Sequence, residues 1–409
     1  MAGVAAGLAA ASLGAVGLGV RLAAPPQAGN TLTQDAFVWQ RSWTPSLAGA
    51  VAAQSSLFTD WHVLTAEFSP TGTAMAHPDW AALLAGGHAA HAVLRIEAPL
   101  DAGRMGGVLA GIAGVVANLP PAARRIIEID HDAATSHLLA YAGFLRSLRA
   151  ALPGGTSLDA TALPTWIGQP GFFEMAQAVD RLVLQVHAAG DPRLGVFDPG
   201  RALADIRHLA RETTTPFLVS LPAYEVGVSE LGGRLHVASE TPMLDGQAGM
   251  EMAASPEQVA SFLAQLRADP PPTLAGLVWF RLPLPGDRRV WTMQTLRAVM
   301  LGQKLDGRVA IASRAGRIAG VTDIVLQAGG TDARLPDSIA LPPGCSAADG
   351  LGRYVIDGDR LVLRGRDDNS GDDNSGGSNS GGSLLPAHAT LLAGWTRCGA
   401  GPEAMGAEN

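Results

Sequence analysis

The sequence is poor in charge, and in lysine above all. Charged residues make up 16% of the 409 positions, and Lys304 is the only lysine among 29 basic residues. The net charge is −8, and the arginines form no basic cluster. Nucleic acids and anionic membrane surfaces both recruit clustered positive charge, so this composition argues against either as a partner.

Cysteine is scarce as well. Cys345 and Cys398 are the only two, and their wide separation resembles no metal site. We therefore expect no metal and no cofactor. In an exported protein the two thiols could pair as a disulfide, and two unpaired buried thiols are the alternative.

Apolar residues, in contrast, are abundant at 47%, which is ample for a large core and excludes disorder as the overall state. Eight strand-like runs occur before Gly, Pro or polar breaks, with enough chain between them for crossover helices. These runs are 36–40, 63–68, 92–97, 126–130, 158–163, 182–187, 217–221 and 277–282.

Helical patterns fall between several of these runs. Residues 135–152 carry an apolar stripe and end at Pro153-Gly154, and residues 255–268 begin with a Ser-Pro-Glu start signal. Eight strands alternating with helices predict a (β/α)₈ TIM barrel over residues 35–304. A doubly wound open sheet is the alternative.

The run Ile126 to Asp132 contains acids at every second position, Glu128, Asp130 and Asp132. Successive side chains of a strand point to opposite faces, so the three acids share one face. In a barrel the inward residues near a strand's carboxyl end reach the mouth, where such enzymes work. Ionising all three acids in a partly desolvated mouth is unfavourable, so one should stay protonated near neutral pH.

Other chemically active side chains also stand at predicted strand ends. Acids together with Trp and Tyr are typical of a carbohydrate site, because sugar rings stack on aromatic planes while carboxylates bind hydroxyls or act on the glycosidic oxygen. Glu67 is the expected further carboxylate of the site. The expected substrate-binding residues are Trp43, Arg41, Glu97, Trp166, Gln185, His187, Tyr224 and Arg281. For the three alternating acids the alternative is structural, with Glu128, Asp130 and Asp132 only pairing Arg95, Arg41 or Arg281 inside the barrel.

The two ends of the chain differ in texture from this central part. Residues 1–30 include a stretch of small apolar residues without charge, which predicts an export signal or membrane anchor, with a buried helix as the alternative. Residues 305–400 show short strand-like runs and predict a small β domain. An Asp/Asn/Ser/Gly-rich run at 366–383 interrupts that domain and predicts a flexible loop.

Several motifs resemble a bacterial family, domain of unknown function 3142. They include Phe-Val-Trp-Gln-Arg-Ser-Trp-Thr-Pro (37–45), Ile-Glu-Ile-Asp-His-Asp-Ala-Ala-Thr-Ser (127–136) and Leu-Gln-Val-His (184–187). The tail resembles it too, through Leu-Pro-Asp-Ser-Ile-Ala-Leu-Pro (335–342) and Gly-Trp-Thr-Arg-Cys (394–398). The resemblance implies a barrel and a C-terminal region, and it implies no activity.

The alternating acids are also similar to the motif of family 18 chitinase-like hydrolases. That likeness implies that Asp132 protonates the leaving oxygen and that Asp130 supports the substrate. Asp132 stands where those enzymes have Glu, which shortens the reach of the acid by one methylene, and Glu128 replaces their Asp. We expect an exported, periplasmic or envelope-anchored barrel that acts on a polysaccharide or glycan. A non-catalytic glycan-binding or envelope interaction protein is the alternative.

Overall fold

The computed structural model describes most of the chain after its first 31 residues. The described residues are 32–97, 100–101, 103–187, 195–231, 234–238, 250–284, 287, 289–364, 383–398 and 407–408. The expected export segment lies outside them, as does the expected flexible loop except for Ser383. Within the described ranges, no helix has the length and apolarity needed to cross a membrane.

Eight parallel strands form a closed barrel, as predicted. Strand β1 pairs with β12 on one side and with β2 on the other, and these two pairings close the sheet and exclude the open-sheet alternative. The barrel strands are β1 (Thr33–Val38), β2 (Trp61–Ser69), β4 (Ala90–Ile96), β5 (Ile126–Asp130), β6 (Ser157–Ala162), β7 (Arg181–Gln185), β8 (Phe217–Pro222) and β12 (Leu274–Phe280).

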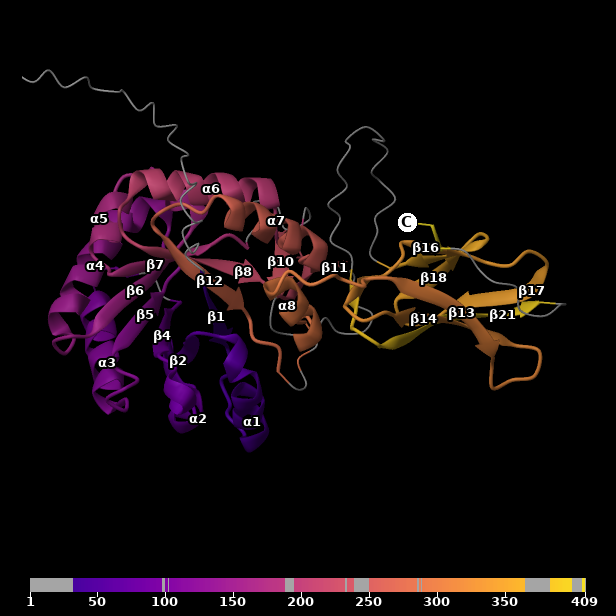
Figure 1. Cartoon of the computed structure of the whole chain (residues 1–409), viewed down its shortest axis with the longest axis horizontal. Helices are drawn as coiled ribbons and strands as arrows, with labels where there is room; N and C mark the ends of the chain where they lie inside the picture. Colours follow the sequence, from indigo (N-terminus) through magenta and orange to yellow (C-terminus); the bar gives the residue numbers. More distant parts are fainter. Residues whose placement is uncertain are drawn as a thin grey trace, which may run out of the picture. The chain divides into compact units, whose positions relative to one another are not determined.

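Helices follow the strands along the chain and lie on the outside of the barrel (Figure 1). They are α1 (Pro45–Gln54), α2 (Trp80–Leu84), α3 (Met105–Asn118), α4 (Leu138–Ala151), α5 (Phe172–Gln177), α6 (Pro199–Glu212), α7 (Pro256–Ala268) and α8 (Met293–Met300). Helix α7 shows why the sequence pattern was informative. The Ser255 side chain accepts a hydrogen bond from the Gln258 backbone N–H at 3.3 Å and so caps the helix, and Pro256 occupies its first turn.

The main core lies between strands and helices, and a smaller one lies inside the barrel. On β5, Ile127 and Ile129 belong to the outer core, whereas Glu128 points inward. The inner apolar cluster consists of Phe37, Trp39, Leu64, Ala76, Val93, Val183, Leu218 and Val278. Filling of the interior by side chains is expected for a barrel of eight strands.

Two antiparallel additions to the barrel were not predicted. Strand β3 (Gly72–Met75) pairs with the end of β2. Strands β9 (Glu225–Leu231), β10 (Arg234–Ala238) and β11 (Met250–Ala253) form a separate sheet between β8 and α7. Their sequences are short and contain Gly and charged residues, so their strand character depends on pairing with one another.

After α8 the described chain forms antiparallel sheets, as the strand-like runs indicated. One sheet has the order β13-β14-β21-β17, a second has the order β18-β19-β16-β22, and β15 pairs with β20. The strands are β13 (Val309–Ala315), β14 (Thr322–Ala328), β15 (Ala333–Arg334), β16 (Ser338–Ala340), β17 (Cys345–Gly350), β18 (Tyr354–Asp357), β19 (Arg360–Leu363), β20 (Leu384–Leu385), β21 (Thr390–Cys398) and β22 (Ala407–Glu408).

The two cysteines form a disulfide, which confirms the predicted pairing. Cys345 and Cys398 are direct cross-strand partners of β17 and β21, with their Cα atoms 3.9 Å apart. The bond joins positions 53 residues apart and so spans the low-complexity run. Closing a loop of this size limits the conformations of the unfolded chain.

Reduction of this disulfide is expected to lower the free energy of unfolding by about 4 kcal/mol, the loop-entropy value for a closed loop of this length. Urea unfolding of the full chain with and without reductant measures the difference. Alkylation of the unreduced protein should label no cysteine. Labelling of both thiols would show that the pair does not form.

Candidate active site

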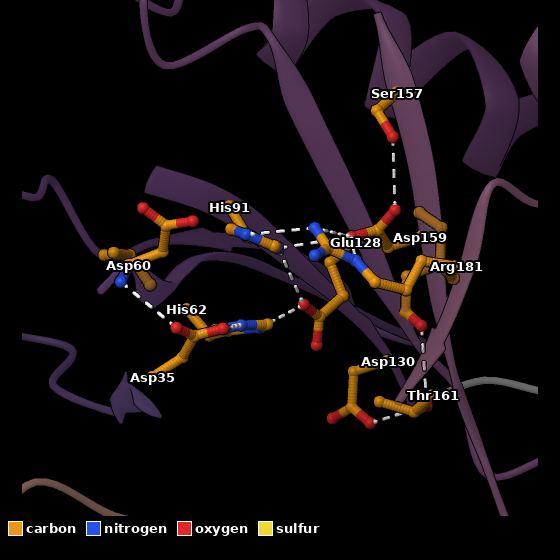
Figure 2. A network of polar contacts seen from close by, with 12 residues as sticks. Asp35, Asp60, His62, His91, Glu128, Asp130, Ser157, Asp159, Thr161 and Arg181 are labelled. Atoms are coloured by element: carbon orange, nitrogen blue, oxygen red, sulfur yellow. Dashed lines mark hydrogen bonds and ion pairs between the residues drawn. The ribbon is translucent and has the colours of Figure 1, made fainter. Parts of the chain in front are cut away.

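A layer of charged side chains crosses the inside of the barrel near the amino ends of its strands (Figure 2). We call it the interior polar layer. Its members occupy inward positions that the strand register places side by side: His62 is paired with His91, Glu128 with Asp159, and Asp159 with Arg181. The layer consists of Asp35, His62, His91, Glu128, Asp159 and Arg181.

Acids and bases alternate along this layer. Nδ1 of His62 lies 2.5 Å from Oε2 of Glu128, and its Nε2 lies 3.6 Å from Oδ2 of Asp35. The two imidazole rings stack with centroids 3.9 Å apart. Nδ1 of His91 lies 3.2 Å from Oδ2 of Asp159. Neither histidine has any exposed surface.

Arg181 closes the chain of contacts at its other end. Its Nε and Nη2 donate to Oδ2 of Asp159 at 3.1 and 3.0 Å, and Nη2 also donates to Nε2 of His91 at 3.4 Å. Ser157 donates to the second oxygen of Asp159 at 3.2 Å. The buried Asp159 carboxylate is therefore paired and hydrogen-bonded, as a charge in a barrel interior requires.

The protonation of the central pair follows from these contacts. Burial alone would lower the pKa of His62, but the Glu128 and Asp35 carboxylates raise it to about 9. Burial would likewise raise the pKa of Glu128, but the two histidines hold it well below its usual range. His62 and Glu128 thus form an imidazolium–carboxylate pair at neutral pH.

This layer changes the expected role of Glu128. The sequence placed Glu128 with the catalytic acids at the mouth, but its side chain has no exposed surface and is bound within the layer. Alternation along a strand determines the face of each residue and leaves its depth undetermined. The sequence did not indicate His62 and His91 as site residues, because each stands one residue before an expected strand, 63–68 or 92–97. Each nevertheless alternates in phase with the inward-facing residues of its strand.

His62, His91 and Glu128 are also the group of described residues whose donor atoms lie close enough to ligate a metal, within 4.8 Å of one another. Their geometry fits hydrogen bonding better. An ion bound by both imidazoles must lie near the plane of each ring, whereas these rings are stacked with an interplanar angle of 28°. Arg181 also donates to Nε2 of His91, which leaves the proton of a neutral ring on Nδ1, facing Asp159.

An open cavity of about 450 Å³ lies at the carboxyl ends of β4 and β5. Asp130 and Asp132 line it, together with Arg95, Glu97 and Tyr141. The complete lining adds Ile96, Leu100, His131, Ala133, Ala134, His137 and Ala140. The cavity therefore gathers the last two acids of the alternating motif beside a basic residue and a phenol.

Asp130 is held on one side and left partly open on the other. Its Oδ1 accepts hydrogen bonds from the Thr161 hydroxyl at 3.2 Å and the Gln185 amide at 3.3 Å, and its Oδ2 lies 4.0 Å from Nε of Arg95. Burial and the Asp132 carboxylate raise the pKa of Asp130 to about 7, against the opposite effect of Arg95. Asp130 is thus only partly ionised near neutral pH.

Two further expected residues, Glu67 and Arg41, bind each other. Nε and Nη2 of Arg41 donate to the two carboxylate oxygens of Glu67 at 2.6 and 2.7 Å. The Glu67 carboxylate thus has a bidentate partner. Glu97 lies 3.6 Å from Nε of Arg95 at the cavity. Trp43 is half-buried against the core.

The expected aromatic residues behave differently from one another. Trp166 was expected to offer a stacking surface, but it is 1% exposed and its Nε1 donates to the Ala133 carbonyl at 3.1 Å. It is a core residue beneath the cavity wall. His187 stacks on Phe280 and bonds to the Tyr224 hydroxyl at 3.1 Å, and burial lowers the pKa of His187 to about 4. Trp166, His187 and Tyr224 do not belong to the residues that line the cavity.

Arg281, another expected substrate-binding residue, is almost fully buried. Its Nη2 lies 3.4 Å from Oδ1 of Asp287, whose second oxygen accepts from the Gln40 amide at 3.5 Å. Arg281 is therefore paired with Asp287, and it is not among the residues that line the cavity.

The burial of Trp166 leads to a stability prediction. Trp166→Phe is expected to lower the free energy of unfolding by about 1–2 kcal/mol, because it removes buried volume and leaves the Ala133 carbonyl without its donor. Urea unfolding measures this loss. Weakened glycan binding at unchanged stability would instead show that the ring faces the ligand.

Solved structures with similar folds share little sequence with this chain. The spore cortex-lytic enzyme SleL of Bacillus cereus has 15% identity and a TM-score of 0.49, with 69% of this chain and 76% of that chain covered. A chitinase from Bacteroides thetaiotaomicron has 12% identity and a TM-score of 0.47, with 66% and 97% covered. The GH18 chitinase ChiB of Flavobacterium johnsoniae has 10% identity and a TM-score of 0.43, with 66% and 94% covered. These scores carry no evidence on activity.

Family assignment comes from the sequence instead. No curated protein matches the chain. The model of a domain of unknown function, DUF3142, matches residues 73–285. This range contains every barrel strand except β1 and β2, and it contains all three acids of the alternating motif. The match ends before the disulfide, so the resemblance of the tail stays a prediction. The chain belongs to the DUF3142 family.

Proposed function

We propose that this protein acts on a polysaccharide or glycan outside the cytoplasm by carboxylate acid catalysis. Asp132 is the proton donor and Asp130 the electrostatic support, while Glu67 is a second carboxylate near the mouth. The observation that carries the proposal is the cavity at the carboxyl ends of β4 and β5, which both aspartates line. Catalytic groups of such barrels stand at this end of the strands.

The two aspartates differ in burial and in hydrogen bonding. Asp130 is fixed by Thr161 and Gln185, and its raised pKa means that the pair holds a proton near neutral pH. Asp132 is exposed at the cavity, so it is the member that can reach a glycosidic oxygen. As donor, Asp132 must therefore take up the proton of the pair, which leaves Asp130 as the ionised carboxylate that supports the substrate.

The rest of the cavity suits a polar ligand. Arg95 and Glu97 can bind hydroxyl groups, and the buried hydroxyl of Tyr141 has no hydrogen-bond partner among the described residues. These features support recognition of a hydroxylated substrate such as a sugar.

An extracytoplasmic location is part of the proposal. The Cys345–Cys398 disulfide supports it, because such bonds persist in oxidising compartments. We propose further that residues 1–30 direct export or anchor the chain, that residues 35–304 act as the catalytic unit and that residues 305–400 form an appended β domain. Fractionation of cells that express the full chain tests whether the protein is periplasmic or anchored to the envelope.

Incubation of the purified protein with a panel of oligosaccharides and insoluble polysaccharides tests the activity. Release of new reducing ends from at least one glycan is the expected result. Binding without turnover would favour the alternative of a non-catalytic glycan-binding barrel, which the short reach of Asp132 also favours. Neither binding nor turnover across the panel would remove both functions and leave the acids a structural role.

A further inference from the structure

Trp395 belongs to β21, an inner strand of the β13-β14-β21-β17 sheet (Figure 1). The residue before it, Gly394, faces the core, because a Cβ atom there would lie 2.7 Å from Cδ1 of Leu361. Leu361, on β19, belongs to the apolar cluster that this sheet shares with the β18-β19-β16-β22 sheet. Side chains alternate along a strand, so Trp395 points away from that cluster, and it is partly exposed.

Charged side chains lie beside the indole ring on the same face of the sheet. The strand register pairs Trp395 with Asp323 of β14 and with Asp349 of β17. Directly paired residues of neighbouring strands share a face, with Cβ atoms about 4.5–5.5 Å apart. Asp323 also accepts a hydrogen bond from Nε of Arg314, its partner on β13, at 3.3 Å. Arg397 stands two positions after Trp395 and so shares its face. We call these five residues the Trp395 face.

The apolar surface next to the indole ring is small. Val325 and Leu392 are register partners on the same side of the sheet, and Val325 is almost fully buried while Leu392 is partly buried. The large apolar side chains that are exposed in the described ranges all lie outside the four strands of this sheet. A stable protein interface needs an apolar centre of several such side chains, so the Trp395 face suits a small ring better than a protein partner.

The chemistry of the face fits a neutral ring that carries hydroxyl groups. Two carboxylates and two guanidinium groups accompany the indole, so their charges balance and favour neither a cationic nor an anionic ligand. An aromatic plane packs against the C–H face of a sugar, while carboxylates accept hydrogen bonds from its hydroxyls and guanidinium groups donate to them. Asp349 and Arg397 are exposed, so both can contact such a ligand.

We propose that the Trp395 face binds a neutral polysaccharide chain, as a glycan-binding site separate from the cavity. None of its five residues lines the cavity. The site needs no catalysis, and it shares with the proposed function only the class of ligand. Two sites on one chain hold a polymer more tightly than either site alone, because the second contact is intramolecular.

Co-sedimentation of the full chain with insoluble neutral polysaccharides tests the proposal, with cellulose, chitin, curdlan and starch granules as the probes. The wild-type protein should sediment with at least one polymer. On that polymer, Trp395→Ala should raise the dissociation constant about tenfold, because it removes the stacking plane. Asp349→Ala should raise it about threefold through the loss of a hydrogen-bond acceptor, and its exposed position keeps the fold intact.

Ile356→Ala and Asp357→Ala are the matched controls. Both residues are exposed on β18 of the other sheet, Ile356 by 42%. The first removes an exposed apolar side chain and the second an exposed carboxylate, so each repeats one of the test substitutions away from the Trp395 face. Both variants should sediment as the wild-type protein does.

Three results would overturn the proposal. In the first, the wild-type chain sediments with none of the four polymers. In the second, Trp395→Ala binds as tightly as the controls or, where that variant does not fold, Asp349→Ala does. In the third, sedimentation velocity shows a dimer that Trp395→Ala abolishes, which would make the face an interface between two copies of the chain.

This site and the catalytic proposal fail separately. Sedimentation that depends on Trp395, without turnover of any glycan, removes only the catalytic proposal. Turnover of a glycan, without sedimentation that depends on Trp395, removes only the second site.

Discussion

The Asp132→Asn variant is expected to lose glycan hydrolysis by about 10²–10⁴-fold and to keep glycan binding. Asn retains the shape and hydrogen-bonding capacity of Asp but cannot donate the proton. Asp132 is exposed at the cavity, so the substitution leaves the core intact and its unfolding free energy should change by no more than about 0.5 kcal/mol. Release of reducing ends and a binding isotherm on the same glycan measure the two effects.

Asp269→Asn provides a control of identical chemistry. Asp269 follows α7, its side chain is 83% exposed and it does not line the cavity. Its replacement should leave both turnover and binding at wild-type values. Turnover in Asp132→Asn equal to that of this control would show that another group donates the proton.

The second large effect is expected on stability. Arg181→Met should lower the free energy of unfolding by about 3–5 kcal/mol, because it leaves the completely buried Asp159 carboxylate without its counter-charge. The loss exceeds the value of a surface ion pair because Asp159 cannot turn to solvent. Urea unfolding of the full chain measures it.

Two further variants separate charge from packing in this experiment. The double variant Arg181→Met, Asp159→Asn should recover much of the lost stability, since it no longer buries a lone charge. Arg146→Met, at an exposed position of α4, should change stability by at most about 0.5 kcal/mol. A loss in Arg181→Met below about 1 kcal/mol would show that Asp159 does not depend on Arg181 as its counter-charge.

Much of the fold could be predicted from local pattern. The eight barrel strands, the helix beginning near Ser255 and the Cys345–Cys398 pairing all follow from alternation, capping and composition. Strand and helix patterns depend on residues close in the sequence, and the cysteine pairing was suggested by the presence of only two cysteines, so a single sequence is enough to predict them. The sheet β9–β11 escaped prediction because its short strands are stabilised by one another.

The candidate site could be predicted only in part. The alternation at Glu128, Asp130 and Asp132 showed that the acids share one face, but it could not show that Glu128 lies in a closed layer while Asp132 lies at an open cavity. Depth depends on the stagger of neighbouring strands, which is a property of the closed barrel.

The sequence by itself therefore determined which residues alternate, which begin helices and which two cysteines are available to pair. Only the tertiary structure brought His62 of β2 and His91 of β4 against Glu128, and only it buried Trp166 beneath the Ala133 carbonyl. The physical reason is that side-chain charge and burial depend on neighbours distant in the chain, whereas strand and helix periodicity depends on neighbours a few residues away.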